Sequence, residues 1–169
     1  MTPAASIALV SAAIVAIAML GEFRVSLANE HRLLRDGAIE PPDPVYGTMR
    51  WAYPATFVVM ALEGSAGAPA PVPLAIAGAI VFVLAKALKF WAIASLGRRW
   101  TFRVLVLPRA PLVTSGPYRW LRHPNYVGVV GELIGFALLV GAWLTGPVSV
   151  IFFGYLLRRR IAAEERALY

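Results

Sequence analysis

The feature that most constrains this chain is a series of long apolar segments without charge. The first runs from about Ala4 to Leu20, and Glu22 and Arg24 follow it. A helix of this length rises about 25 Å, at the lower end of what crosses the hydrocarbon core of a bilayer. A cleavable signal peptide is the alternative, and it is disfavoured because no basic residue precedes the apolar run. The segment is therefore predicted to be a membrane span.

Two further apolar segments lie in the N-terminal half. The segment at about 49–62 is short and contains Pro54. We interpret it as a span shielded by its neighbours, with a re-entrant segment as the alternative. The segment at about 70–96 is long enough to tilt or to reach the headgroups. Its Lys86 and Lys89 are predicted to extend their side chains to the membrane interface, as Glu63 does at the end of the preceding span.

The last apolar stretch, 126–157, is too long for one crossing. Residues typical of a tight break and a new helix start divide it: Gly141, Gly146 and Pro147. The pattern predicts a helical hairpin of about 125–142 and 146–160. Within it, Gly131 and Gly135 are spaced as on a helix-packing face.

Composition agrees with a membrane protein. Hydrophobic residues make up 59% and charged residues 15%, whereas soluble domains carry about 25% charged residues. The net charge of +7 is not read as nucleic-acid binding, because too little polar surface is available to carry a basic patch. With no cysteine and two histidines, neither a disulfide framework nor a metal site is predicted.

The basic residues are distributed as the positive-inside rule describes. Fourteen of the sixteen lie in three segments, 22–50, 97–125 and the C-terminal tail, whereas 64–69 and 143–145 contain none. The chain is therefore predicted to be an all-α integral membrane protein with about five transmembrane helices. The N-terminus would lie outside and the C-terminus in the cytoplasm. Residues 1–169 would form a single domain, with three spans in 1–96 and the hairpin with its polar flanks in 97–169.

Polar residues gather just before the fourth predicted span. Arg119, Arg122, His123, Asn125 and Tyr126 fall within eight positions. Pro124 suits the first turn of the helix, so the preceding side chains lie at its partially positive end. Arginines beside free helix amides can bind a carboxylate or phosphate. An arginine cluster at anionic lipid headgroups is the alternative.

Two other groups of residues are candidates for chemistry. Arg160, Glu164 and Glu165 lie at the cytoplasmic end of the last helix, at the same membrane level as the Arg-His cluster. Arg160 and Glu164 are spaced for a helix ion pair, and adjacent glutamates point about 100° apart. Glu132 lies inside the fourth span, where a carboxylate indicates a functional group, with a structural hydrogen bond as the alternative.

Together these motifs resemble one family. Leu112-Val-Thr-Ser-Gly-Pro-Tyr118 is followed by Arg122-His-Pro-Asn-Tyr-Val-Gly128 and then by Glu164-Glu165-Arg-Ala-Leu168. This order resembles the isoprenylcysteine carboxyl methyltransferase family, which belongs with the membrane phospholipid methyltransferases. The resemblance covers about residues 97–168, and the N-terminal half contributes only hydrophobic spans.

The resemblance implies use of S-adenosylmethionine without a Rossmann fold, in a cytoplasmic pocket formed by the C-terminal half. It implies that His123, Pro124, Tyr126 and Gly128 line the cofactor. The C-terminal residues expected to complete the pocket are Arg160, Glu164 and Glu165. Arg122 would orient or neutralise the reacting oxygen of a lipid acceptor that comes from the bilayer.

The acceptor is left open between three lipid classes. Eukaryotic prenylcysteine enzymes continue beyond the Glu-Glu motif and carry an uncharged residue at the position of Glu132. Short bacterial relatives that look like this chain are associated with O-methylation of alkylpyrones or alkylresorcinols. We therefore expect a phenolic or pyrone lipid, with Glu132 as base or orienter. Prenylcysteine and phospholipid acceptors are the alternatives.

Two other functions compete with methyl transfer. Arg-His-Pro-Asn-Tyr also resembles a motif of membrane sterol and steroid reductases that use NADPH, but those commonly have an acidic residue where this chain has Val129. A non-enzymatic lipid-binding membrane subunit would need the arginines only for anionic headgroups.

Overall fold

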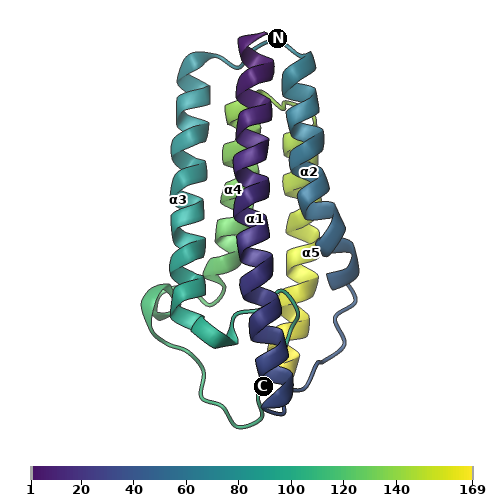
Figure 1. Cartoon of the computed structure of the whole chain (residues 1–169), viewed down its shortest axis with the longest axis vertical. Coiled ribbons are helices and arrows are strands. Elements are labelled where there is room, and N and C mark those ends of the chain that lie inside the picture. Colours follow the sequence, from purple (N-terminus) through teal and green to yellow (C-terminus); the bar gives the residue numbers. More distant parts are fainter. Residues whose placement is uncertain (1, 169) are drawn as a thin grey trace.

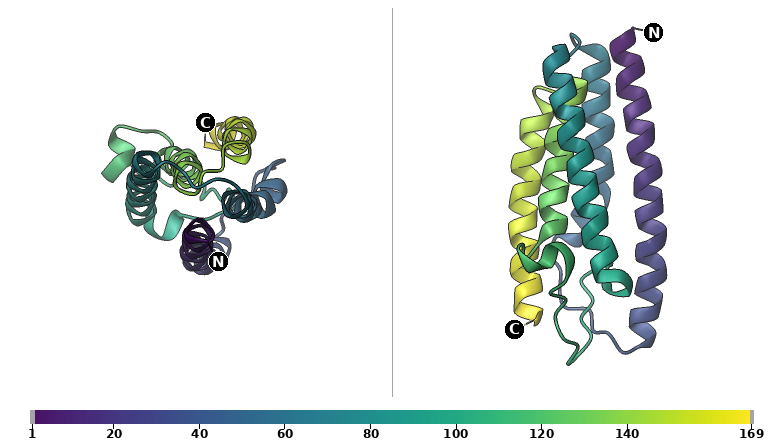
Figure 2. Two further views of the ribbon diagram at one scale, coloured as in Figure 1. Left: turned by 90° about the horizontal axis from the view of Figure 1, so that it is seen from above. Right: turned by 90° about the vertical axis from the view of Figure 1, so that its left-hand side faces the viewer.

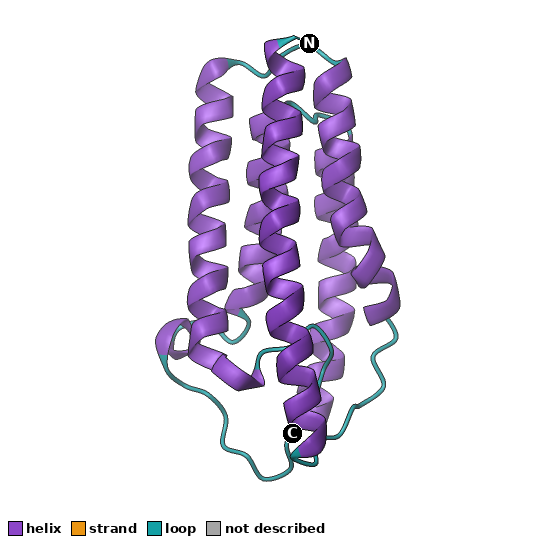
Figure 3. Cartoon of the chain, viewed as in Figure 1, coloured by secondary structure: helices purple, strands orange, loops and turns teal. Residues whose placement is uncertain are grey.

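Five long helices lie side by side in the computed structural model, which describes residues 2–168 (Figure 1, Figure 3). The helices are α1 (Pro3–Arg35), α2 (Tyr46–Ala66), α3 (Val72–Leu96), α4 (Pro124–Val140) and α5 (Thr145–Leu168), with short 3-10 helices η1 (Gly97–Arg99) and η2 (Gly116–Arg119). The described residues form no strand beyond an isolated bridge between Ile39 and Val106. The all-α prediction is confirmed.

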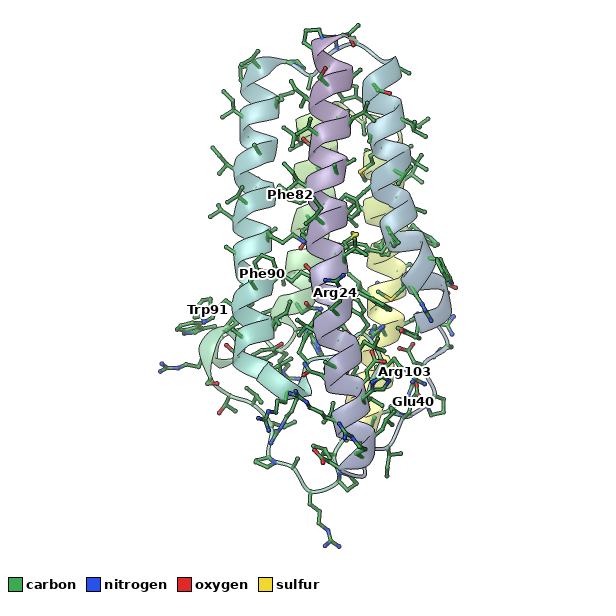
Figure 4. The ribbon with its side chains drawn as sticks, in the orientation of Figure 1. Arg24, Glu40, Phe82, Phe90, Trp91 and Arg103 are labelled. Carbon is green, nitrogen blue, oxygen red and sulfur yellow. The ribbon has the colours of Figure 1, made fainter. Side chains whose placement is uncertain are left out.

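The two ends of the bundle differ in character. Short connections, 67–71 and 141–144, join helices at the end that carries the N-terminus. Longer segments, 36–45 and 97–123, lie at the other end with the C-terminus (Figure 1, Figure 2). The Arg103 guanidinium ties the two long segments together by donating from Nε to Glu40 at 2.7 Å (Figure 4). The motif residues of the chain therefore gather at one end.

The predicted hairpin is present, and its break has the expected chemistry. Gly141 has φ 77°, a left-handed conformation that favours glycine. Glu63 at the end of α2 accepts hydrogen bonds from the backbone N–H groups of Leu144 and Thr145 at 2.8 and 2.9 Å. Glu63 was predicted to lie at the membrane interface. In the structure its carboxylate also caps the N-terminus of α5.

The first two helices extend beyond their predicted limits. The apolar run was expected to end near Leu20, but α1 continues to Arg35. Its inner face changes there from apolar to polar, with Glu22, Ser26, Asn29 and Glu30 all buried. The α2 helix runs without interruption through Pro54, so the segment at 49–62 is not re-entrant in this structure.

The outer surface of the bundle is apolar. Two helices, Pro3–Arg35 and Val72–Arg99, are long and apolar enough to cross a membrane by length and composition, and α4 is apolar but shorter. Large hydrophobic side chains face outward on several helices, among them Ile14, Ile17, Val83, Leu84 and Ile151. Such a surface suits hydrocarbon rather than water.

Helices α3 and α4 make the most extensive contact in the bundle. A Cβ added to Gly135 would lie 2.5 Å from the Phe82 nitrogen, and one added to Gly78 would lie 2.5 Å from the Leu139 nitrogen. These glycines let the two backbones approach closely, and the predicted small-residue packing face is confirmed. The close contact fixes α4, and with it the motif at its N-terminus, against α3.

Candidate functional site

The segment before α4 is held against α3 by its Ser-Gly-Pro sequence. Gly116 has φ 58°, and a Cβ there would lie 2.0 Å from the Ser95 hydroxyl. Pro117 is buried in the first turn of η2, and Trp120 contacts Trp91 of α3 with ring centroids 5.9 Å apart. This docking brings residues 119–123 to the N-terminus of α4.

The helix start and the Glu-Glu motif meet at the polar end of the bundle. His123 precedes the first turn of α4, which begins at Pro124 as predicted. Its Nδ1 lies 3.5 Å from a Glu164 carboxylate oxygen and its Nε2 lies 3.6 Å from a Glu165 oxygen. Arg122 lies 3.9 Å from the same Glu165 oxygen. Residues about forty positions apart in the sequence thus form one cluster of opposite charges.

A second layer of hydrogen bonds supports Glu164 from inside. The Tyr126 hydroxyl donates to Glu164 and accepts from Arg160 Nε at 2.8 Å, and the Tyr126 ring stacks on His123 with centroids 5.6 Å apart. Glu164 is therefore held by His123, Tyr126 and Arg160, whereas Glu165 is half-exposed. The structure distinguishes the two glutamates: Glu164 faces inward and Glu165 outward.

The buried Arg160 guanidinium joins four parts of the fold. It contacts Asp43 at 3.4 Å and Glu164 at 3.4 Å, and it donates to the Phe102 carbonyl. Asp43 in turn accepts from the backbone N–H groups of Val45 and Tyr46 at the start of α2. Arg160 was expected to bind the cofactor directly, and in the structure its donors are directed to protein groups.

The pKa values of His123 and Glu164 shift in opposite directions. The carboxylate of Glu164 raises the pKa of His123, although burial opposes the shift. Burial alone would raise the pKa of Glu164, but the hydrogen bonds from His123 and Tyr126 and the charge of Arg160 bring it below its usual value. His123 and Glu164 therefore favour the charged pair near neutral pH.

The stability of the wild type is expected to fall as pH rises above about 6.5, the usual pKa of histidine. Because the folded pKa of His123 is raised, its stabilising contribution is complete below the unfolded pKa and is lost as pH rises through the folded pKa. His123→Asn should lack this part of the pH dependence, and His31→Asn, at an exposed site, should keep it. Melting temperatures of the three proteins across this range test the prediction, and parallel curves for wild type and His123→Asn would contradict it.

A hollow of about 580 Å³ lies beside the charged cluster, lined by Arg122, Ala162, Glu165 and Arg166. The Arg122 side chain is 85% exposed, so its guanidinium is free to reorient toward a ligand. Nearby, the buried side-chain oxygen of Asn125 has no hydrogen-bond partner within the described protein. The hollow therefore has an exposed guanidinium and a half-exposed carboxylate in its wall.

Of the residues predicted to bind the cofactor, Glu165 is the one that lines this hollow, and two of the others pack inside the bundle. Gly128 faces α3, where an added Cβ would lie 3.0 Å from the Lys89 Cβ. Pro124 is fully buried in the first turn of α4. Both shape the start of α4 rather than the surface of the hollow.

Glu132 belongs to a buried ring of alternating charges. Its Oε2 lies 3.0 Å from Lys86 and its Oε1 3.5 Å from Lys89. The same two lysines contact the two oxygens of Glu22 at 3.0 and 2.7 Å, and the Tyr53 hydroxyl donates to Glu132 at 2.7 Å. The ring is neutral overall and joins α1, α3 and α4, with Tyr53 added from α2.

The prediction that Lys86 and Lys89 reach the membrane interface was wrong. Both are buried, and Lys86 lies between the rings of Phe82 and Phe90, which Figure 4 labels on α3. Two carboxylates inside the bundle offset the cost of burying the two ammonium groups. Lys86 and Lys89 are three residues apart, which puts both side chains on one face of a helix. This spacing was the feature of the sequence that could have indicated their shared burial.

The sequence also gave no assignment to Asp43, Glu22 or Tyr53. Glu22 begins a polar pattern that recurs at Ser26 and Glu30, spaced as one face of a continuing helix. That periodicity could have shown that α1 extends past the apolar run. No local pattern marks Asp43 as the partner of Arg160, because the pairing joins opposite ends of the sequence.

Comparison with known proteins agrees with this arrangement. The sequence model described as the isoprenylcysteine carboxyl methyltransferase (ICMT) family matches residues 78–169. A Bacillus subtilis protein described as uncharacterized protein YpbQ is 33% identical over 156 residues, which cover 92% of this chain and 93% of that protein. An uncharacterized protein of Haemophilus influenzae is 27% identical over 145 residues, which cover 85% and 84% of the two chains. No solved structure matches the chain.

A helical bundle with an apolar outer surface and a charged cluster at one end defines a membrane-embedded class of protein. Within this class, the chain belongs to the isoprenylcysteine carboxyl methyltransferase family. The matched region contains both the start of α4 and the Glu-Glu motif. At the level of the family, the protein is a membrane methyltransferase.

Proposed function

We propose that the protein transfers a methyl group from S-adenosylmethionine to an oxygen of a lipophilic acceptor. The observation that carries the proposal is the cluster of Arg122, His123, Glu164 and Glu165 beside a hollow at the polar end of an apolar bundle. A water-soluble cofactor can reach this end, while a lipid acceptor can approach along the apolar helices.

The residues present fit this cofactor chemically. S-adenosylmethionine carries a carboxylate, an ammonium group, ribose hydroxyls and a sulfonium. His123, which favours its charged form, can bind the carboxylate, and Glu165 can accept from the ammonium or hydroxyl groups. The buried Asn125 oxygen, which has no hydrogen-bond partner among the described residues, would be a further acceptor, and the Tyr126 ring offers an aromatic face that attracts a sulfonium.

The chain contributes mainly position and charge. When bound, the cofactor supplies an electrophilic methyl group. Its transfer to the deprotonated acceptor oxygen would leave the sulfur as a neutral thioether, and His123 and Glu165 would hold the cofactor. Glu164, fixed by His123, Tyr126 and Arg160, would hold the start of α4 and the end of α5 in one relative position. The exposed Arg122 side chain would neutralise the attacking oxygen.

A phenolic or pyrone lipid is the acceptor we propose, and Glu132 is better suited to positioning than to proton abstraction. The Glu132 carboxylate is fully buried beside two ammonium groups and the Tyr53 hydroxyl, and although its Oε1 has no hydrogen-bond partner among the described residues, that oxygen is not exposed to a substrate. A general base must be free to accept a proton from the substrate. Glu132→Gln is therefore expected to weaken the bundle without removing a basic limb from the pH profile of turnover.

The proposed topology has five membrane spans, with the N-terminus outside and the C-terminus and site in the cytoplasm. The short uncharged connections at one end and the basic segments at the other support this orientation. Membrane lipids would surround the bundle, and neither nucleic acid nor a metal takes part in the proposal.

Calorimetry with purified protein tests the choice of cofactor. We expect S-adenosylhomocysteine to bind and NADPH not to bind. Glu165→Gln should weaken S-adenosylhomocysteine binding by about ten-fold or more, since it removes a charged hydrogen-bond acceptor. Glu40→Gln, an exposed carboxylate paired only with Arg103, is the matched control and should bind as the wild type does. Binding of NADPH in place of S-adenosylhomocysteine would instead favour a reductase.

A further inference from the structure

The inner face of α1 carries three buried polar side chains near the polar end of the bundle, Ser26, Asn29 and Glu30. Burying such groups costs free energy unless each finds a hydrogen-bond partner. The three are not among the residues that line the hollow beside Glu165. Their hydrogen-bond partners therefore show what they hold in place.

The Asn29 side chain holds the segment that follows α3. Its amide nitrogen donates to the carbonyl oxygens of Gly97 and Trp100 at 3.1 and 2.8 Å. An asparagine amide has two protons, so these two bonds use both of its donors. The Trp100 side chain is itself buried, and the segment is thus fixed against the inner face of α1.

The Ser26 hydroxyl holds the other end of the same segment. It donates to a Glu30 carboxylate oxygen at 2.7 Å and accepts from the Phe102 backbone N–H at 2.7 Å. Because Glu30 takes the single proton of the hydroxyl, the Ser26 oxygen is left to accept from Phe102. The Phe102 ring also stacks on Phe23 of α1, with ring centroids 6.5 Å apart. The backbone at Phe102 is therefore placed by α1.

Phe102 connects α1 to the cluster at the candidate site. Its carbonyl accepts from the buried Arg160 guanidinium, whose Nε donates to the Tyr126 hydroxyl at 2.8 Å. Tyr126 donates in turn to Glu164, which lies beside His123. A series of hydrogen bonds thus links α1 to the cluster, although Figure 2 shows α1 and α5 on different sides of the bundle.

We propose that Ser26 and Asn29 are positioning residues of the methyl-transfer site, which hold residues 97–102 and so, through Arg160, orient Glu164 toward His123. The inference rests on the proposed function and adds to the site a helix whose side chains do not line the hollow. A displacement of about 1 Å takes a hydrogen bond beyond its normal length. Bonds from a guanidinium are among the stronger ones in proteins, so a shift of the Phe102 carbonyl would be felt at Arg160.

Titration of the histidines by NMR, on the protein in lipid nanodiscs, tests the inference without a cofactor. In the wild type, the Glu164 carboxylate raises the pKa of His123. Ser26→Ala and Asn29→Ala should each return the pKa of His123 toward the usual histidine value of about 6.5, because Glu164 is held less firmly. An unchanged pKa of His123 in both variants would overturn the inference.

Ser6→Ala is the matched control for Ser26→Ala. It removes a hydroxyl from the opposite end of α1, where that hydroxyl donates to the Thr2 carbonyl, and it should leave the titration of His123 as in the wild type. A shift as large as that of Ser26→Ala would contradict a specific role for Ser26.

A double variant shows whether the effect passes through Arg160. Adding Ser26→Ala to Arg160→Leu should leave the pKa of His123 where Arg160→Leu alone puts it, since the connection is already broken. If Ser26→Ala shifts the pKa of His123 equally with and without Arg160, the proposed connection is wrong.

S-adenosylhomocysteine binding separates this inference from the proposed function. Ser26→Ala should raise the Kd for S-adenosylhomocysteine by about five-fold, as expected for the loss of about one hydrogen bond, and Ser6→Ala should not change it. If the wild type binds S-adenosylhomocysteine and both Ser26→Ala and Asn29→Ala keep its affinity, the inference fails and the proposed function stands. If the wild type does not bind S-adenosylhomocysteine, the proposed function fails, and the titration of His123 still decides whether α1 orients the cluster.

Discussion

Replacing Glu22 by leucine is expected to lower the apparent free energy of unfolding by about 3–5 kcal/mol. The substitution leaves Lys86 and Lys89 buried with Glu132 as their sole remaining carboxylate in the ring. One ammonium group then has no counter-charge in a low-dielectric interior, and its desolvation is uncompensated. Unfolding in mixed detergent micelles, followed by circular dichroism, measures the change.

Two comparisons show whether charge balance is the cause. Combining Glu22→Leu with Lys89→Met leaves Lys86 and Glu132 as a neutral pair and should recover more than half of the loss. Glu40→Leu, which breaks an exposed pair with Arg103, should cost no more than about 1 kcal/mol. If the loss of unfolding free energy in the double variant equals the sum of the losses in the two single variants, charge balance in the ring is not the cause.

Replacing Arg160 by leucine is expected to reduce S-adenosylhomocysteine affinity by at least about 100-fold, equivalent to about 2.7 kcal/mol. The substitution removes the group that joins Asp43, Tyr126 and Glu164. Glu164 would lose its fixed orientation toward His123, and the buried Asp43 carboxylate would lose its cation. Calorimetry gives the affinity, and a melting curve gives the stability.

The neighbouring arginine supplies the matched control. Arg159→Leu changes the same residue type one position away on the exposed face of α5, and it should leave both S-adenosylhomocysteine affinity and stability close to wild type. Arg160→Lys keeps the charge but not the planar guanidinium. Compared with Arg160→Leu, it should therefore recover more of the stability than of the S-adenosylhomocysteine affinity. Equal effects of Arg159→Leu and Arg160→Leu would contradict the positioning role.

The helices and the hairpin break could be predicted because their signals are local. Apolar runs set the helices, and Gly141 with Pro147 marks the turn between α4 and α5. The length of α1 could not be read from its apolar run, since Glu22 was taken as the end of a span. The spacing of Glu22, Ser26 and Glu30 indicated a continuing helix, but no local pattern identified Lys86 and Lys89, more than sixty residues away, as the partners of Glu22.

The candidate site could be located from the sequence but not resolved in detail. The prediction that the Arg-His cluster and the Glu-Glu motif lie at one level agrees with the His123 contacts to Glu164 and Glu165. The predicted i, i+4 contact of Arg160 with Glu164 is present at 3.4 Å. Which glutamate faces inward depends on how α5 is rotated against α4, and that rotation is set by tertiary packing around Tyr126.

Transfer of labelled methyl from S-adenosylmethionine to lipid by the purified protein tests the central claim most directly. The wild type should label a phenolic or pyrone lipid presented in membranes, and Glu165→Gln and Arg160→Leu should lose most of that transfer while Glu40→Gln keeps it. Absence of label from phenolic, prenylcysteine and phospholipid acceptors alike, with a folded wild-type protein, would contradict the account.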